Sequence, residues 1–239
     1  ERRTMLRGCT TRSGAFFKAA RCPLRNLSTL NISKLNALEH HPEIHGTADF
    51  DWIRGSNRTL FLTNSQEQNV LSQKRASSLL TELERTTEFQ TTCSSTVITN
   101  SAPPCFSIGT SFRELLELKE KGDYESAAQY LADLTCASYT LNEYDNQTIT
   151  IPNGFTLGSA VSFALSSVAT VATENSVFAF PESEVAFAPH AGASYYLSNL
   201  SDGIGYYLAL TGNPLRSYNI KEAGLASHFV ENEGIPSLL

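Results

Sequence analysis

The stretch PNGFTLGSAVSF, residues 152–163, decides the fold prediction for this chain of 239 residues. It follows a run rich in β-branched residues, 147–151, and contains two glycines, Gly154 and Gly158, ahead of small and apolar residues. Glycine allows the positive φ angles of tight turns and a close approach between chain segments. The pattern therefore predicts a strand, a turn and a small-residue helix that packs closely against its neighbours.

Other strands and helices alternate on both sides of this stretch. Apolar periodicity and capping residues predict helices at 71–86, 124–139, 157–169 and 218–223, and one that begins at Phe112 after the capping box Ser111 to Glu114. Runs of β-branched and aromatic residues predict strands at 59–63, 96–99, 147–151 and 176–180. Strands that alternate with helices indicate an α/β fold with parallel pairing.

Charge is distributed unevenly along the chain. Residues 2–38 hold eight Arg or Lys and no acid, a charge of +8, so the remainder carries −14 because the total is −6. An Arg-rich, Ser/Thr-rich and acid-free segment is typical of a mitochondrial transit peptide, so we expect residues 1–30 to direct the chain to the mitochondrial matrix. A solvated basic tail or an RNA-binding arm is the alternative. No run of 18 apolar residues occurs, so no membrane-spanning helix is predicted.

Histidine and cysteine patterns do not predict a metal site. His40, His41 and His45 lie close together, but only His41 and His45 have a helical spacing, and Pro42 interrupts it. We therefore interpret residues 31–56 as a connector. The five cysteines form no CxxC pair, which favours free thiols over a disulfide framework or a zinc site.

Two glycine-bearing turns, Ile108 to Ser111 and Asn153 to Ser159, each join a predicted strand to a predicted helix. Backbone N–H groups at a helix start lack intrahelical acceptors, so two such turns side by side can hold a developing oxyanion. The alternative is that the glycines only allow the backbone to turn and have no role in binding. Taken alone, Glu182 does not indicate a catalytic role either, because a Glu at a strand end is usually solvated or caps a helix.

Several segments together carry a family resemblance. Phe106-Ser-Ile-Gly-Thr-Ser111 is similar to the motif Phe-Cys-Ala-Gly-Gly-Asp, and Asn153-Gly-Phe-Thr-Leu-Gly-Ser-Ala160 to His-Gly-x-x-Met-Gly-Gly-Gly. Pro181-Glu-Ser-Glu-Val-Ala-Phe-Ala-Pro-His-Ala-Gly-Ala193 is similar to Pro-Glu-Thr-x-x-Gly-x-x-Pro-Asp-x-Gly-Gly. These segments resemble the crotonase (enoyl-CoA hydratase/isomerase) superfamily, most closely its 3-hydroxyisobutyryl-CoA hydrolase branch.

The resemblance implies a fold and a site. The fold would be a crotonase-like α/β spiral of ββα units over residues 57–239, with covering helices that this sequence lacks. The substrate would be an acyl-CoA thioester, with no other cofactor and no metal. Its carbonyl oxygen would lie between the amides of Thr110 and Ser159, next to Gly109 and Gly158. Glu182 would be the acid/base carboxylate, and His190 would replace an Asp that assists near the substrate hydroxyl.

Four departures from the family pattern fall at this site. Thr110 and Ser159 replace glycines, Ser111 replaces an Asp, and His190 puts a neutral or cationic ring where the family has an anion. We therefore interpret the chain as a catalytically degenerate homologue with a structural role, such as a small-subunit component of the mitochondrial ribosome. Its partners would be proteins, with the basic arm reaching ribosomal RNA.

The alternative is an active 3-hydroxyisobutyryl-CoA hydrolase of valine catabolism. A hydratase or isomerase is disfavoured, because the second glutamate of the hydratases falls at Ser162.

Overall fold

The computed structural model describes residues 43–46, 50–54, 58–62, 67–88, 95–100, 104–143 and 147–237. All of these belong to one compact unit of the chain. The targeting-like segment 1–30 and residues His40 and His41 lie outside the described residues. Within the described ranges, no helix has both the length and the hydropathy needed to cross a membrane.

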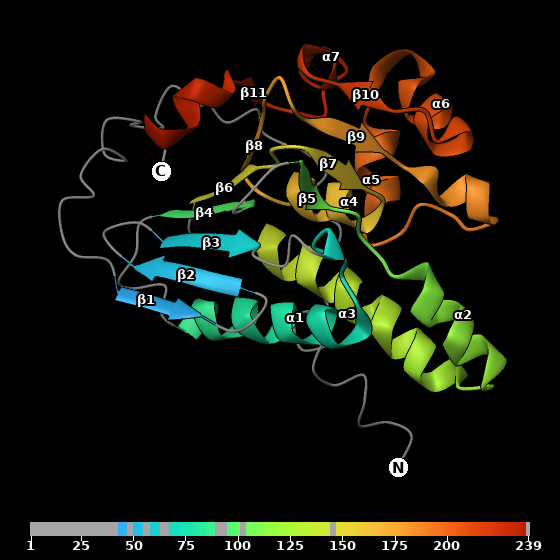
Figure 1. Ribbon diagram of the computed structural model, residues 1–239. Coiled ribbons are helices and arrows are strands. Elements are labelled where there is room, and N and C mark those ends of the chain that lie inside the picture. Colours follow the sequence, from blue (N-terminus) through green and yellow to red (C-terminus); the bar gives the residue numbers. More distant parts are fainter. Residues whose placement is uncertain are drawn as a thin grey trace. The chain divides into compact units, whose positions relative to one another are not determined.

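The described strands form two sheets (Figure 1). The larger sheet has the order β1 (Glu43–Gly46), β2 (Phe50–Arg54), β3 (Arg58–Leu62), β4 (Ser95–Asn100), β6 (Gln147–Ile151), β8 (Ala169–Ala172) and β11 (His228–Phe229). Its first two pairings are antiparallel and the others are parallel. The smaller sheet has the order β10 (Leu215–Arg216), β9 (Val177–Ala179), β7 (Phe155–Leu157) and β5 (Cys105–Ser107), with only β10 antiparallel to its neighbour.

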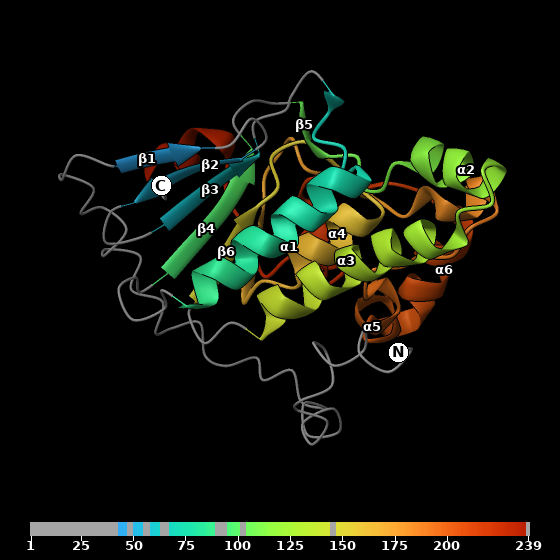
Figure 2. The ribbon, with the colours of Figure 1, turned by 90° about the horizontal axis from the view of Figure 1, so that it is seen from below.

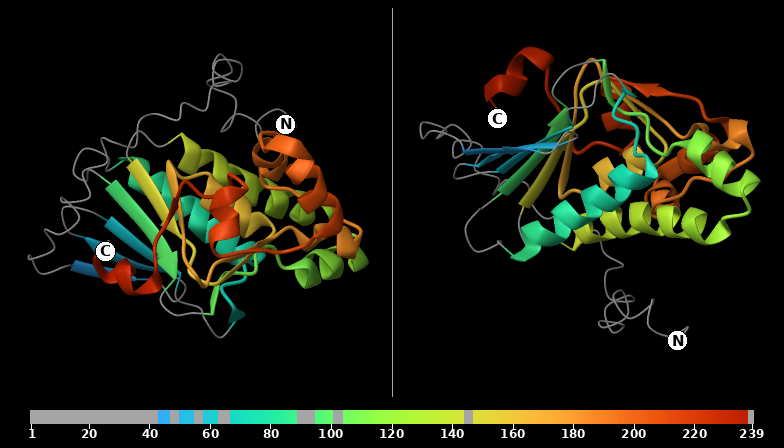
Figure 3. Two further views of the ribbon diagram at one scale, coloured as in Figure 1. Left: turned by 90° about the horizontal axis from the view of Figure 1, so that it is seen from above. Right: turned by 60° about the horizontal axis from the view of Figure 1, so that its bottom comes forward.

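Helices alternate with the parallel strands, as the sequence predicts. They are α1 (Gln73–Glu88), α2 (Phe112–Glu120), α3 (Tyr124–Asn142), α4 (Ser159–Leu165), α5 (Ala193–Ser198), α6 (Ile204–Thr211) and α7 (Tyr218–Glu222). Short 3-10 helices occur at η4 (Pro181–Val185), η5 (Ser201–Gly203) and η6 (Asn232–Ser237). Helices α1 and α3 lie side by side (Figure 2), and both pack along the same side of the larger sheet (Figure 3).

The larger sheet begins upstream of residue 57, so the predicted connector 31–56 includes two strands, β1 and β2. Phe50 is in register with Leu62, and Trp52 is in register with Leu60. This alternation has the period of two that strands require. In β2 the alternation covers only Phe50, Asp51 and Trp52 before the apolar Ile53 follows, so the pattern is too short to predict a strand.

Helix α4 contributes to two hydrophobic clusters. Its Phe163 and Ala164 belong to a cluster with side chains of α1, α3 and β4. Its Val161 belongs to a second cluster with side chains of β9, α5, α6 and α7. All of α4 except Leu165 is buried, and the small residues at its start let the neighbouring segments approach closely. The start of α4 is therefore held from several sides.

Tyr130, in the middle of α3, fixes the first glycine-bearing turn. Its buried hydroxyl donates to the carbonyl of Leu71 and accepts a hydrogen bond from the Ser111 amide at 2.8 Å. Burial raises the pKa of Tyr130 well above its usual value, so the phenol remains a donor. The phenol thus ties the start of α2 to the segment that precedes α1.

The predicted capping box forms only in part. Ser111 caps α2 by accepting a hydrogen bond from the Glu114 amide at 3.3 Å. The Glu114 carboxylate instead accepts a hydrogen bond from the Gln73 amide at 2.7 Å. It therefore caps α1, because the Ser111 amide already has the phenol of Tyr130 as its acceptor.

We expect Tyr130→Phe to lower the free energy of unfolding by about 1–3 kcal/mol, because it removes the hydroxyl that bonds to the partly buried Ser111 amide and to the carbonyl of the buried Leu71. Tyr124→Phe is the matched control on the same helix. Its side chain is exposed, so its effect should stay within about 0.5 kcal/mol. Urea denaturation of the two variants checks this, and equal effects would contradict the role given to the Tyr130 hydroxyl.

Candidate functional site

The two glycine-bearing turns meet at one end of the smaller sheet. Strands β5 and β7 are parallel neighbours, so Gly109 and Thr110, which come after β5, lie next to Gly158 and Ser159, which come after β7. Gly109 has a φ of +73°, and a Cβ at this residue would lie 2.3 Å from the Leu157 carbonyl oxygen and 3.2 Å from the Ser159 nitrogen. The first turn therefore tolerates only glycine at this position, and it brings Thr110 next to Ser159.

Thr110 and Ser159 are joined through their hydroxyl groups. The Thr110 Oγ1 lies 2.7 Å from the Ser159 Oγ, and both residues are buried. Ser159 is the first residue of α4, so its amide has no intrahelical acceptor. The structure thus brings together the two residues whose amides the sequence analysis singles out, and their side chains are hydrogen-bonded to each other.

Glu182 lies in η4, directly after strand β9, and its side chain is fully buried at 0% exposure. It packs against Gly158, where a Cβ would lie 2.9 Å from the Glu182 Oε1. Neither carboxylate oxygen has a hydrogen-bond donor among the described residues. A buried carboxylate without a donor is costly in free energy, so its nearest polar neighbour matters.

That neighbour is His190, in the loop between η4 and α5. Its Nδ1 lies 3.5 Å from the Glu182 Oε1, and its Nε2 lies 2.7 Å from the Thr110 Oγ1. The backbone carbonyl of His190 accepts a hydrogen bond from the Ser162 hydroxyl at 3.1 Å. The imidazole therefore lies between the carboxylate and the hydroxyl pair.

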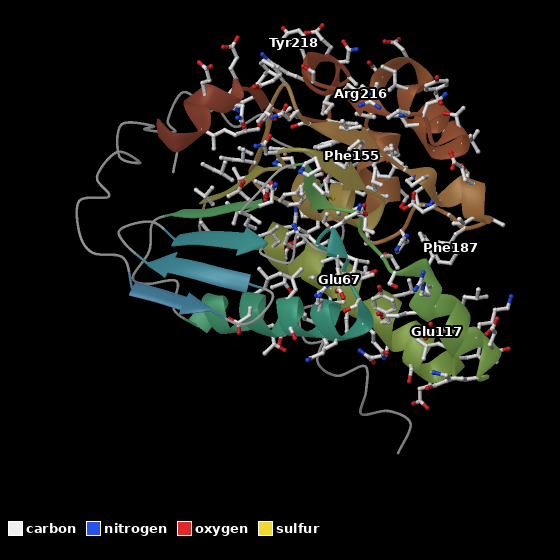
Figure 4. The ribbon with its side chains drawn as sticks, viewed as in Figure 1. Glu67, Glu117, Phe155, Phe187, Arg216 and Tyr218 are labelled. Atoms are coloured by element: carbon white, nitrogen blue, oxygen red, sulfur yellow. The ribbon has the colours of Figure 1, made fainter. Side chains whose placement is uncertain are left out.

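Aromatic rings border the imidazole on its other sides. The ring centroid of His190 lies 5.2 Å from that of Phe187 and 6.2 Å from that of Phe112, in edge-to-face arrangements. Phe187 is visible beside α2 in Figure 4. The sequence analysis missed both phenylalanines, because they come from different elements and only the fold shows that they share a site with His190.

All six predicted site residues, Gly109, Thr110, Gly158, Ser159, Glu182 and His190, lie in one cluster. Ser111 stands apart in role, as the cap of α2. No group of three His, Cys, Asp or Glu within the described ranges is arranged to hold a metal ion. Cys105 is no rival nucleophile, because burial raises its pKa to about 11 and keeps the thiol protonated.

The sequence analysis also did not predict that Asn153 lies at the centre of a polar hydrogen-bond network. Its Nδ2 donates to the Asn232 Oδ1 at 2.7 Å, and its Oδ1 accepts a hydrogen bond from the Thr173 hydroxyl at 3.1 Å. Its backbone pairs with the side-chain amide of Asn100. The network holds the start of the second turn, and its partners are too far apart in the sequence to be predicted.

Comparison with known proteins identifies a family that this chain matches. The model of the enoyl-CoA hydratase/isomerase family matches residues 57–239. A crystal structure of an enoyl-CoA hydratase from Rhodobacter sphaeroides superimposes with a TM-score of 0.73 and 20% identity, covering 83% of this chain and 57% of that one. This likeness confirms the crotonase-like α/β fold.

Two proteins illustrate the range of similar sequences. The mitochondrial 3-hydroxyisobutyryl-CoA hydrolase of Xenopus tropicalis is 33% identical over 133 residues, which is 56% of this chain and 34% of that protein. The small ribosomal subunit protein mS47 of Arabidopsis thaliana is 31% identical over 183 residues, 77% of this chain and 44% of that protein. The chain thus spans less than half the length of either relative. Because the family model covers most of the sequence, the chain belongs to the enoyl-CoA hydratase/isomerase family.

Proposed function

We propose that the chain is a 3-hydroxyisobutyryl-CoA hydrolase-like protein that has lost thioester hydrolysis and serves as a structural component of a mitochondrial assembly. The small subunit of the mitochondrial ribosome is the assembly that we favour. The observation that carries the proposal is the packing of Glu182, which is fully buried with His190 as its polar neighbour.

A carboxylate that activates water must reach that water directly or through one other molecule. The Glu182 Oε1 lies 3.5 Å from the His190 Nδ1 and packs so closely on Gly158 that a Cβ there would lie 2.9 Å from it. The family pattern has an Asp at the position of His190, which would leave the carboxylate with different surroundings. The substitution argues that Glu182 no longer performs the family reaction.

The hydrogen-bonded hydroxyls of Thr110 and Ser159 also argue against thioester hydrolysis. An acyl oxygen bound between the amides of Thr110 and Ser159 would have to share its space with their Cβ atoms and hydroxyl groups. Those hydroxyls already satisfy each other at 2.7 Å, and Thr110 also bonds to His190. Separating buried hydrogen-bonded groups costs free energy that a glycine pair would not require.

The partner class follows from charge and from the comparisons. Residues 39–239 together with Glu1 carry the net −14, which disfavours broad contact between the folded domain and RNA phosphates. We infer docking on protein partners, with the basic segment 1–30 as the part that contacts ribosomal RNA. Similarity to mS47 extends over 183 residues, and several similar hydrolases are named mitochondrial, which supports a location in the matrix.

An active hydrolase is the second candidate. Glu182 is retained, and it lies beside Gly158 and within one cluster with both turns. A rearrangement of the His190 loop would be needed to bring the carboxylate to a thioester. The two candidates differ in one measurable property, which is multiple turnover.

We expect no multiple-turnover thiol release from 3-hydroxyisobutyryl-CoA by the full chain, above that of its Glu182→Ala variant. In an active hydrolase, removal of the acid/base group would lower the rate by roughly 100-fold or more. A thiol-detecting assay checks this, with an active mitochondrial 3-hydroxyisobutyryl-CoA hydrolase as the positive control. Turnover that depends on Glu182 would establish the second candidate instead.

The tight packing of Glu182 predicts an energetic coupling with Gly158. Gly158→Ala should lower the free energy of unfolding by about 2–4 kcal/mol, from an unfavourable positive φ and from overpacking. In the Glu182→Ala background the cost should fall by about 1 kcal/mol or more, because the contacting carboxylate is gone. A double-mutant cycle by urea denaturation measures the coupling, and additive effects would show that the carboxylate does not press on Gly158.

For the structural role, we expect the affinity-tagged full chain to sediment with small-subunit ribosomal RNA in gradients of mitochondrial lysate from its own organism. A soluble matrix enzyme serves as the marker for unbound protein. Sedimentation of the tagged chain with that marker would exclude the ribosome as the assembly.

A further inference from the structure

The side chains of Thr110, His190 and Glu182 lie next to one another in that order, and the family pattern does not contain this combination. The Thr110 Oγ1 lies 2.7 Å from the His190 Nε2, and the His190 Nδ1 on the opposite side of the ring lies 3.5 Å from the Glu182 Oε1. A hydroxyl, an imidazole and a carboxylate in this order are the parts of a nucleophile, its general base and the acid that orients the base. Two of the three are the residues that replace family residues.

The surroundings decide which ring nitrogen carries the proton. With its hydrogen on Nε2, the ring would direct the Nδ1 lone pair at the Glu182 carboxylate. Two hydrogen-bond acceptors would then face each other, which is unfavourable. A hydrogen on Nδ1 instead lies on the side of the ring whose nitrogen is 3.5 Å from the Glu182 Oε1, although these two atoms do not complete a hydrogen bond in this arrangement. The Nε2 then accepts from the Thr110 hydroxyl, and Ser159 donates to the Thr110 Oγ1. In this tautomer, His190 is positioned to take the Thr110 proton.

The imidazole is also held in place. The rings of Phe112 and Phe187 border it, and the Ser162 hydroxyl holds the backbone carbonyl of its residue. The side chain of His190 remains 14% exposed and Phe187 37% exposed, so solvent reaches the cluster from their side. Thr110 itself is only 5% exposed, so an acyl donor would have to reach its hydroxyl past these two side chains.

We propose that Thr110 is an acyl acceptor, with His190 as its general base and Glu182 as the positioning residue. The ligand class is an activated acyl ester or thioester. The Thr110 Oγ1 forms a bond to the acyl carbon, the bond to the leaving oxygen or sulfur breaks, and the proton passes through the His190 Nε2 to the leaving group. The product is an acylated threonine and a free alcohol or thiol.

This inference goes beyond the proposed function, because it gives Glu182 a role that needs no contact with water. Release of the acyl group would require a water molecule next to His190. The attached acyl group would itself occupy the space between Thr110 and the imidazole, which slows that step. We therefore expect modification of the protein in a single event rather than turnover.

The chain contains a second hydroxyl next to an imidazole, which serves as a comparison. The Ser227 Oγ lies 3.0 Å from the His228 Nδ1, and Ser227 is exposed. Its hydroxyl also donates to the Thr170 carbonyl and accepts from the Thr170 amide, and no carboxylate among the described residues forms an ion pair with His228. If proximity of an exposed hydroxyl to an imidazole were enough, Ser227 would also be labelled.

The experiment treats the full chain with p-nitrophenyl acetate and maps acetyl groups by peptide mass spectrometry over time. We expect a burst of nitrophenolate and a single acetyl group on the peptide that contains Thr110. Thr110→Val should abolish that label, Thr110→Ser should retain it, and His190→Gln should slow it about 100-fold. Glu182→Gln should slow it and Glu182→Asp should restore part of the rate, and Ser227→Ala should not change it.

Thermal unfolding of each variant verifies that it is folded, and Thr110→Ser together with His190→Gln keeps the test valid if Thr110→Val is unstable. Absence of label on Thr110 in the folded chain overturns the proposal, as does a rate that His190→Gln leaves unchanged or one that Ser227 matches. Absence of both label and turnover leaves the proposed function standing alone. Thiol turnover that persists in Thr110→Val and disappears in Glu182→Ala overturns both.

Discussion

The burial of α4 between two hydrophobic clusters is the constraint on which the rest of the structure depends. Val161 packs on one side, and Phe163 and Ala164 pack on the other. A helix buried on both sides cannot shift without opening both clusters, and protein interiors are too closely packed for that. Its first residue, Ser159, is therefore fixed, and the turn that precedes it must close around Gly158.

This constraint explains why changes at the site remain local. With the helix fixed, a residue larger than glycine at either turn must find its partners within a few ångströms. Thr110 and Ser159 do so by bonding to each other, and Thr110 also bonds to His190. Buried polar groups are normally hydrogen-bonded, and the hydroxyls of Thr110 and Ser159 and the Nε2 of His190 meet that requirement together. The His190 Nδ1 and both Glu182 oxygens have no hydrogen-bond partner among the described residues.

How far the sequence could predict the structure differs from element to element. The strand at 147–151 and the small-residue helix that follows can be predicted from β-branched and small residues, which act locally. The predicted turn between them instead contains strand β7, because residues 155–157 pair with β5 and β9 in the smaller sheet. Helix α4 ends at Leu165 rather than at the predicted residue 169. The Ser166 hydroxyl bonds back to the Ser162 carbonyl, and residues 169–172 join the larger sheet instead. A competition between helix and sheet is decided by tertiary contacts, which no local pattern contains.

In the candidate site, too, the sequence predicts some features and the tertiary contacts decide others. The family resemblance predicts which residues gather, and the structure brings all six together. It does not predict their hydrogen bonds, because the directions of Thr110, Ser159 and His190 depend on three separate loops. The position of Phe187 next to the imidazole is hidden for the same reason. The left-handed backbone at Ala186 and Ala191, on both sides of that loop, is equally invisible in the sequence.

The geometry of Glu182 makes two chemistries exclude each other. A carboxylate that acts on water needs its oxygens free, whereas a carboxylate that orients an imidazole needs one of them directed at a ring nitrogen. The 3.5 Å approach of Glu182 to His190 favours the second use. Relative to the family pattern, the site has an imidazole in place of an anion, so a group is added as well as removed. Under our proposals, Glu182 acts through His190 and not on water. For that reason, loss of hydrolysis and reactivity of Thr110 are compatible properties of the same arrangement.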